Sequence, residues 1–235
     1  MAVIDFHSHV LPGIDDGSKS VDMSMQMLEM SVNQGVDVML ATPHFYASRH
    51  RVEAFLKRRN DAYERLAEVK KDFGPKLLLG AEVAFFSGIS HADRIEDLTV
   101  EGTDAMLLEM PFTPWEKSDI REVEYIISKR KIKVILAHLE RYMNFPGNKK
   151  WIEELSKMPL CVQINAESLL GWHKRRPLLK MFKQGEAHLL GSDTHRTDKR
   201  VPNLGQGREV IERKLGKAIL DEIDRRGSEL LQLGG

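Results

Sequence analysis

The chain has 235 residues, which is enough for one substantial hydrophobic core, and α/β barrels of this length often form a single domain. Its 35 Lys and Arg residues balance 35 Asp and Glu residues, so the formal net charge is zero, which argues against general capture of nucleic acid or anionic membrane. No apolar run approaches the roughly 20 residues of a membrane span, and the N-terminus lacks signal-peptide features. Its single cysteine, Cys161, cannot form an intrachain disulfide, so we expect a cytoplasmic protein.

Seven short apolar runs, rich in Val, Ile, Leu and Met, are predicted to be buried strands. They cover residues 2–6, 36–41, 77–82, 104–109, 133–137, 160–165 and 187–191. Amphipathic patterns between them predict helices over 19–34, 51–73, 118–130, 148–158 and 174–184, and one or two terminal helices over 205–231. Ser118 and Asn148 are the expected N-caps of two helices, and Gly216 is the expected break in the terminal segment.

Strands that alternate with helices predict parallel pairing through right-handed crossovers. Seven such units predict an α/β fold, a distorted (β/α)7 barrel in which residues 1–235 form one domain. An open doubly wound sheet is the alternative, because periodicity alone does not distinguish the two. In both folds the functional residues lie at the C-terminal ends of the strands.

Histidines and acidic residues are concentrated at the ends of these apolar runs, where five of the nine histidines lie. His7 and His9 are two residues apart, so on a strand both imidazoles point to one side and can bind one metal ion. Asp193 and His195 repeat this spacing. The candidate metal ligands are His7, His9, Asp16, His44, Glu82, Glu109, His138, Asp193 and His195.

Nine candidates exceed the needs of one ion, because a catalytic zinc-like site takes about three protein ligands. We therefore expect two or three ions. Two metal ions held close together can stabilise both the attacking and the leaving oxygen of a phosphoryl displacement, and can activate a bridging water as the nucleophile. Asp15 competes with Asp16 for the ligand role, and we favour Asp16. Asp5 either orients an imidazole or is a structural carboxylate.

Two arginines follow ligand segments, and a guanidinium group suits the oxygens of a transferring phosphoryl group. They are Arg141 and Arg200, with Arg196 and Lys199 as competitors of the second. Glu140 is expected to be a solvated acid or to lie at a helix start.

Three loop aromatics and the cysteine complete the set of candidates. Phe112, Trp115 and Trp172 either form a rim for an aromatic substrate or, as we favour, pack within loops. Cys161 is followed six positions later by Glu167 where a cysteine phosphatase loop has arginine, so that mechanism is excluded.

The ordered motifs resemble those of the polymerase-and-histidinol-phosphatase (PHP) superfamily. Asp5-Phe6-His7-Ser8-His9 and the loop 11–17 are similar to its opening motif, and the segments 41–44, 80–82, 107–111 and 191–195 follow in order. Within that superfamily, residues 3 to about 205 resemble the bacterial tyrosine phosphatases linked to capsule and exopolysaccharide synthesis. One departure is Leu139, which stands where that branch usually has proline in His-Pro-Glu-Arg and so lacks the φ restraint of proline.

The resemblance implies a distorted (β/α)7 barrel with three divalent ions, often manganese, iron or zinc, bound by the nine ligands named above. It also implies that Arg141 and Arg200 bind phosphate. The implied activity is that of a metal-dependent protein-tyrosine phosphatase, with phosphotyrosine on the tail of a partner tyrosine kinase as substrate. The alternatives are a histidinol-phosphate phosphatase, a nuclease-type phosphodiesterase and a non-catalytic metal-bound docking module.

Overall fold

The computed structural model describes residues 1–233, apart from the side chains of His173 and Lys174, so the last two residues of the predicted domain lie outside it. The described strands are β1 (Ile4–Ser8), β2 (Val38–Ala41), β3 (His44–Phe45), β4 (Lys76–Leu79), β5 (Glu82–Ala84), β6 (Ala105–Glu109), β7 (Lys133–Leu136), β8 (Cys161–Asn165) and β9 (Leu189–Gly191). Each predicted strand corresponds to one of these or to a consecutive pair, and the first begins two residues later than predicted.

The strands form seven paths, because β2 and β3 are parts of one path and β4 and β5 are parts of another. Hydrogen bonds from Gly80 N to the Ala41 carbonyl and from Glu82 N to the Pro43 carbonyl continue the ladder across both interruptions. Strands are ordered β1-β2-β4 in one sheet and β3-β5-β6-β7-β8-β9 in the other, and every pair is parallel.

The first and last strand paths also meet. A parallel bridge joins Ser8 to Thr194, and His9 N donates to the Thr194 carbonyl at 2.8 Å. The curled sheet is therefore a distorted (β/α)7 barrel, which confirms the predicted fold class and excludes the open sheet.

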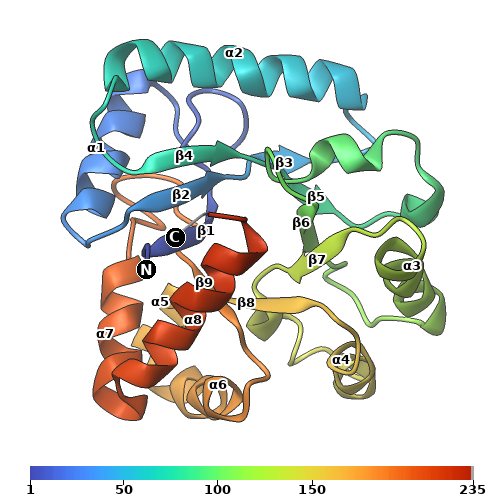
Figure 1. Cartoon of the computed structure of the whole chain (residues 1–235). Coiled ribbons are helices and arrows are strands. Elements are labelled where there is room, and N and C mark those ends of the chain that lie inside the picture. The colour runs from blue at the N-terminus through green and yellow to red at the C-terminus, as the bar shows by residue number, and fades with distance from the viewer. Residues whose placement is uncertain (234–235) are drawn as a thin grey trace.

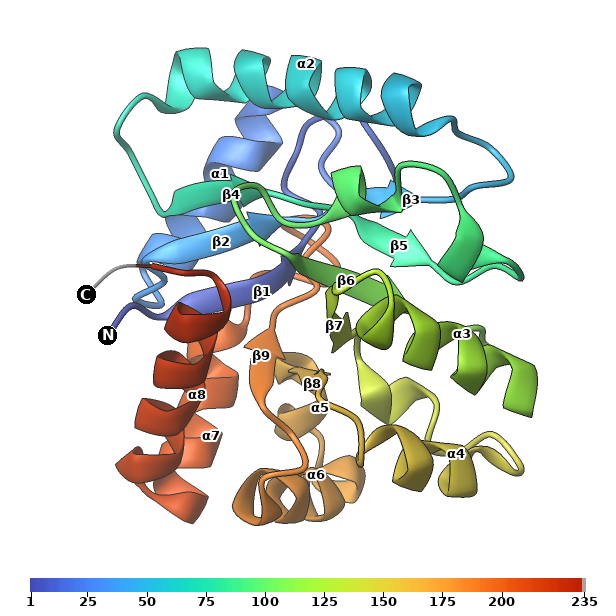
Figure 2. The same cartoon turned by 45° about the vertical axis from the view of Figure 1, so that its right-hand side comes forward.

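Helices surround the curled sheet, with α2 along one side and α6, α7 and α8 along the opposite side (Figures 1 and 2). Their bounds are α1 (Val21–Val32), α2 (Val52–Lys70), α3 (Lys117–Ser128), α4 (Asn148–Leu155), α5 (Ala166–Leu170), α6 (Trp172–Gln184), α7 (Leu204–Leu215) and α8 (Lys217–Leu230). The short helix α5 was not predicted. None of the helices in the described part of the chain has the length and apolar character that a membrane crossing requires.

Helix ends agree with the prediction in one case and differ in two. The break between α7 and α8 lies at Gly216, which has φ +90°, a conformation that favours glycine. Ser118 is not an N-cap, because α3 begins one residue earlier and is capped by Glu116 in a capping box with Asp119. Asn148 is the first residue of α4 rather than its N-cap, and its Oδ1 accepts a hydrogen bond from Trp115 N at 2.7 Å.

The strands bury both faces, as parallel strands covered by helices must. An inner hydrophobic cluster contains Phe6, Ala105 and Leu107, and Leu230 of α8 joins it. The alternate residues Met106 and Leu108 belong to the outer cluster that packs against helices. Because side chains alternate along a strand, Glu109 continues the inward series of β6 beyond the apolar core. The polar site therefore begins where the inner hydrophobic cluster ends.

Candidate metal centre

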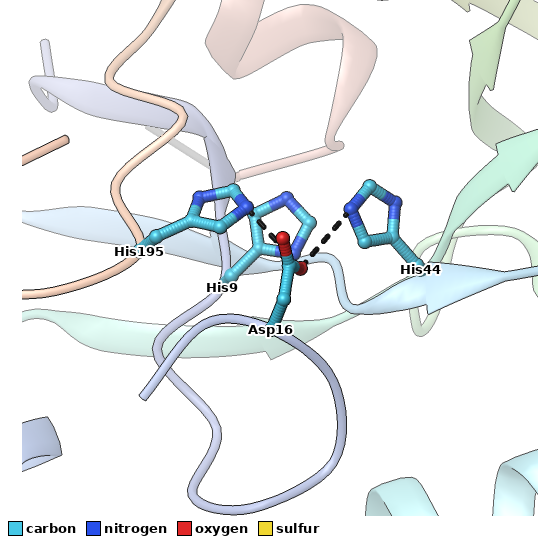
Figure 3. A group of neighbouring side chains, drawn as sticks. All are labelled: His9, Asp16, His44 and His195. Carbon is cyan, nitrogen blue, oxygen red and sulfur yellow. Dashed lines mark ion pairs between the residues drawn. The ribbon is translucent and has the colours of Figure 1, made fainter. Parts of the chain in front are cut away.

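The nine predicted ligands lie together at the C-terminal ends of the strands. His7 is inside β1, Glu82 begins β5 and Glu109 ends β6. His138 and Asp193 each lie two residues beyond the ends of β7 and β9. Their ligand atoms form four groups in which all atoms lie within 4.8 Å of one another. The groups are His9–Asp16–His44–His195, His7–His9–Glu82, His7–His138–Asp193 and His44–Glu82–Glu109. Figure 3 shows the first group, in which the loop after β1 brings the Asp16 carboxylate up to three imidazoles.

Several buried nitrogen and oxygen atoms of this cluster lie close together with their lone pairs facing one another. A bound cation removes the repulsion between such lone pairs. The Nε2 atoms of His7 and His9 are 3.1 Å apart. Glu82 Oε2 lies 3.3 Å from each of them. Within residues 1–233, Glu82 Oε2 and Asp193 Oδ1 are buried and have no hydrogen-bond partner. Imidazole nitrogen and carboxylate oxygen suit zinc, iron and manganese, so the residues present fit divalent ions.

The pKa values of the cluster also indicate that it fits a divalent cation. Burial alone would lower the pKa of His9, but the carboxylates of Asp15, Asp193 and Glu82 outweigh it and hold that pKa well above its usual range. Burial also opposes the charge of Glu82, yet His7, His138 and His44 keep its pKa well below the usual range. Protonated imidazoles therefore neutralise buried carboxylates, and a divalent cation would take over that role by displacing protons.

The two neighbouring aspartates of the loop after β1 have different surroundings. Asp15 Oδ2 lies 2.7 Å from His9 Nδ1 and accepts a hydrogen bond from His44 N, so Asp15 orients His9 from behind. Asp16 instead lies in the first ligand group, with its Oδ1 3.4 Å from His44 Nε2. This geometry favours Asp16 as the ligand, as predicted. Asp5 accepts hydrogen bonds from the backbone of His7 and Ser192, so its role is structural.

Two amides on β8 support the cluster, and the sequence analysis missed both. Gln163 Oε1 accepts a hydrogen bond from His138 N at 2.9 Å. Gln163 Nε2 donates to Asn165 Oδ1, and Asn165 Nδ2 donates to Asp193 Oδ2 at 2.8 Å. The alternation of side chains along a strand was the available signal. Val162 and Ile164 face the outer cluster, which places Gln163 and Asn165 on the inner face.

Both predicted arginines reach the cluster at the same carboxylate oxygen. Arg141 Nη2 donates to Asp193 Oδ2 at 2.5 Å, and Arg200 Nη2 forms an ion pair with the same oxygen. Arg200 Nη1 also lies 2.8 Å from His195 Nε2. The two side chains are 32% and 33% exposed, whereas Asp193 is 2% exposed, so both guanidinium groups stand between the buried cluster and solvent. Within residues 1–233, neither Arg196 nor Lys199 forms an ion pair with a carboxylate of the cluster.

The backbone of this region is strained where the site residues lie. His138, Asp193 and Arg200 have φ values of +33°, +53° and +52°. Such conformations of non-glycine residues cost about 1–3 kcal/mol each and cluster at functional sites. Strain of this kind is consistent with selection for side-chain position rather than for stability alone.

The turn that carries Arg141 corrects one prediction. Leu139–Arg141 form a short 3-10 helix, and Leu139, the residue in place of proline, is buried in the outer cluster. Glu140 lies in the first turn of this helix, as one of the two predicted alternatives stated, but it is buried, so the alternative of a solvated acid was wrong. Its Oε1 accepts hydrogen bonds from Asn165 N and Ser168 Oγ, which ties the turn to the end of β8. Packing therefore fixes the position of Arg141 without the proline.

The three loop aromatics have different environments. Trp115 is buried and donates from Nε1 to the Pro111 carbonyl, which is the expected loop packing. Trp172 is instead the first residue of α6 and is 85% exposed, so the favoured prediction of loop packing was wrong for this residue. Phe112 is 46% exposed and stacks on the His138 ring at a centroid distance of 5.9 Å. Tyr46, which the sequence analysis did not select, stacks on the His44 ring at 5.2 Å, so aromatic rings lie against two residues of the cluster.

An open cavity of about 360 Å³ adjoins the cluster. Its lining residues are Ile14, Asp15, Asp16, His44, Tyr46, Arg49 and His50. Since Asp16 and His44 belong to the first ligand group, this cavity gives a small molecule or side chain access to the proposed ions. We refer to it as the entrance cavity.

The fold and the site define a parallel α/β barrel with a cluster of residues that could hold metal ions, and with two arginines, at its C-terminal end. The chain belongs to the family described as capsular polysaccharide synthesis, CpsB/CapC, whose model matches residues 3–231. This family assignment confirms the resemblance found in the sequence.

Individual relatives match over almost their whole length. Tyrosine-protein phosphatase CpsB of Streptococcus agalactiae serotype III is 26% identical in an alignment of 231 positions that covers 94% of each chain. The putative tyrosine-protein phosphatase CapC of Staphylococcus aureus is 29% identical and covers 94% of this chain and 87% of its own.

Solved structures support the fold. One match comes from the crystal structures of YwqE from Bacillus subtilis and CpsB from Streptococcus pneumoniae, which are described as metal-dependent tyrosine phosphatases. The matched chain has a TM-score of 0.84 and 23% sequence identity, and the match covers 99% of this chain and 96% of that one. A phosphotriesterase homology protein from Escherichia coli matches with TM-score 0.60 and 12% identity over 98% and 99% of the two chains.

Proposed function

We propose that this chain is a metal-dependent protein-tyrosine phosphatase and that residues 1–235 form one catalytic domain. The observation that carries the proposal is the convergence of nine metal-type ligands and two arginines at one end of the barrel. Membership of the CpsB/CapC family and the names of the curated relatives support the reaction and the substrate class.

The metal ligands in this proposal are His7, His9, Asp16, His44, Glu82, Glu109, His138, Asp193 and His195. Four overlapping groups that share His7, His9, His44 and Glu82 suit two or three ions better than one. Manganese, iron and zinc are the expected ions because the ligands are imidazoles and carboxylates. Bound there, divalent ions supply Lewis acidity that polarises the phosphoryl group and lowers the pKa of a water nucleophile.

The residues around the ions have separate tasks. Arg141 and Arg200 orient the non-bridging phosphoryl oxygens and offset the negative charge that they carry in the transition state. Asp15 holds the His9 ring in position, and Asn165 fixes the Asp193 oxygen that both arginines contact. A tyrosinate leaving group has a parent pKa of about 10, so no strong general acid is required.

The proposed substrate is phosphotyrosine in a protein, with the tail of a bacterial tyrosine kinase that controls capsule or exopolysaccharide synthesis as the expected partner. The balanced charge of the chain argues against nucleic acid as a substrate. We expect the protein to act in the cytoplasm, where such a kinase tail is accessible.

The test is phosphate release from a phosphotyrosyl peptide with added manganese, compared with a chelated control. Fast release that the chelator abolishes and manganese restores is the expected result. Protein that binds metal but releases no phosphate from this peptide would contradict the proposal. Hydrolysis of histidinol phosphate in the same preparation would then assign a small-molecule phosphatase, and no hydrolysis at all would assign a docking role.

A further inference from the structure

A second cavity lies beside the entrance cavity and differs from it in chemistry. It has a volume of about 300 Å³, and its apolar lining includes Phe45, Val52, Phe86, Ile95 and Leu98. Phe45, Ile95 and Leu98 are themselves buried core residues, so this cavity lies against the hydrophobic core. Concave, mostly apolar surfaces of this size are typical of ligand sites rather than of ordinary protein surface.

The two cavities share a lining residue. His50 lines both of them. Adjacent residues of β3 also divide between the two sites, because His44 reaches to within 2.8 Å of Glu82 Oε2 whereas Phe45 lines the apolar cavity. Adjacent side chains of a strand point to opposite faces, so the segment 44–50 borders the entrance cavity on one side and the apolar cavity on the other.

The rim of the apolar cavity carries charges that are already compensated. Arg94 forms ion pairs with Glu53 and with Asp97, the latter at 2.7 Å. The other charged lining residues are Arg51 and Asp93, one of each sign. Burial and the neighbouring Arg58 and Arg49 lower the pKa of His50, which leaves its ring neutral at pH 7. The rim therefore offers no net charge to select an acidic or basic group, and the floor selects an apolar one.

We propose that this cavity is an apolar subsite that binds a large aliphatic or aromatic side chain of the phosphoprotein substrate, close in sequence to the phosphotyrosine. This inference rests on the proposed phosphatase function. Because the segment 44–50 borders both cavities, we expect a phosphotyrosine in the entrance cavity to place a side chain from within three positions of it at the apolar subsite. The subsite would make the enzyme selective for peptide sequence, which the metal site alone does not provide.

The experiment measures kcat/KM on phosphotyrosyl peptides in which a single leucine is moved through the three positions on each side of phosphotyrosine in an alanine background. We expect one position, or two adjoining ones, to raise kcat/KM about tenfold through a lower KM, since an added apolar contact in a pocket is worth roughly that factor. Hydrolysis of p-nitrophenyl phosphate, which has no flanking residue, provides the reference activity.

Two variants that fill the apolar cavity with a larger side chain test whether the leucine preference arises there. Ala92 and Ala47 both line the apolar subsite, and Ala92→Phe and Ala47→Phe are each expected to abolish the leucine preference while leaving p-nitrophenyl phosphate hydrolysis unchanged. Ala218→Phe, at an exposed position of α8, is the matched control and is expected to keep the preference. Two filling variants are used so that poor folding of one does not decide the result.

The outcomes separate the subsite from the phosphatase function. Equal kcat/KM for all leucine positions, with p-nitrophenyl phosphate still hydrolysed, would overturn the subsite and leave the proposed function standing. A preference that survives both filling variants would place the selectivity elsewhere and also overturn the subsite. Absence of hydrolysis of every peptide and of p-nitrophenyl phosphate in metal-loaded protein would overturn both proposals.

Discussion

Replacing Arg141 by glutamine separates phosphate recognition from metal binding. The substitution removes the guanidinium group that donates to Asp193 Oδ2 at 2.5 Å. The buried carboxylate keeps its ion pair with Arg200 and its hydrogen bond from Asn165. Because Asp193 stays paired, the variant avoids the large cost of an isolated buried charge. We therefore expect Arg141→Gln to fold and to retain its metal ions.

The expected loss of activity follows from the position of Arg141. Removing one preorganised donor from a developing oxyanion costs about 2.7–4 kcal/mol, or 10²–10³ in kcat. Because the Arg141 side chain is 32% exposed, solvent screens part of its charge, and we expect a value near the lower limit, about 100-fold. Arg141→Lys keeps the charge but loses the fork geometry, so it should retain more activity than glutamine.

The assay combines metal content with steady-state kinetics on a phosphotyrosyl peptide at saturating manganese. The reasoning requires unchanged metal content and a lower kcat. Loss of bound metal would show that Arg141 supports the metal site instead. An unchanged kcat with a raised KM would show that it only binds the ground state. Since Arg141 and Arg200 share one oxygen of Asp193, we expect the double variant to lose less activity than the product of the two single losses.

Three further predictions concern the metal site and the stability of the fold. His7→Ala should lose bound metal and activity together, because His7 belongs to two ligand groups. Gly227→Ala should lower the free energy of unfolding by about 1–3 kcal/mol in urea titrations, because its Cβ would lie 2.8 Å from Phe6 Cε2 across the α8–β1 contact. Burial lowers the pKa of His188 to about 4, so the unfolded chain, with a pKa near 6.5, gains this proton first as the pH falls. His188 therefore reduces stability between pH 6.5 and 4, and since the side chain is partly exposed we expect a loss of only about 1 kcal/mol that His188→Asn removes.

Each of these predictions has a result that contradicts it. Full activity or full metal content in His7→Ala would refute the site as described. A Gly227→Ala variant as stable as the parent would show that α8 moves away from β1 at little cost. Parallel pH–stability curves for the parent and His188→Asn would show that His188 does not titrate differently in the folded and unfolded chains.

Much of the fold and the site was predictable because both depend on short-range patterns. Apolar runs of four to six residues identify parallel strands, and the ends of parallel strands meet at one edge of the sheet. The spacing of His7 and His9 then places two imidazoles on one side of a strand. These inferences need no knowledge of which distant segments touch, so they hold before the structure is known.

The remaining features depend on contacts between segments far apart in the sequence. Nothing in the local sequence distinguishes a buried Glu140 from a solvated one, because its partner is the backbone of Asn165 on another strand. Gln163 is a similar case, since its role comes from the His138 backbone. The prediction ended the second strand at residue 41 and missed its continuation as β3, which depends on hydrogen bonds with the neighbouring strand path.

The two oxygens of Asp193 connect the metal site with phosphate recognition. Oδ1 lies 3.5 Å from Nε2 of both His7 and His9 and has no hydrogen-bond partner within the described residues, so it is free to bind an ion. Oδ2 holds the guanidinium groups of Arg141 and Arg200. One rigid carboxylate thus sets the spacing between the proposed ions and the groups that orient the phosphoryl oxygens. The strained backbone conformation of Asp193 occurs at the residue that connects these two sets of groups, as expected for strain at a functional site.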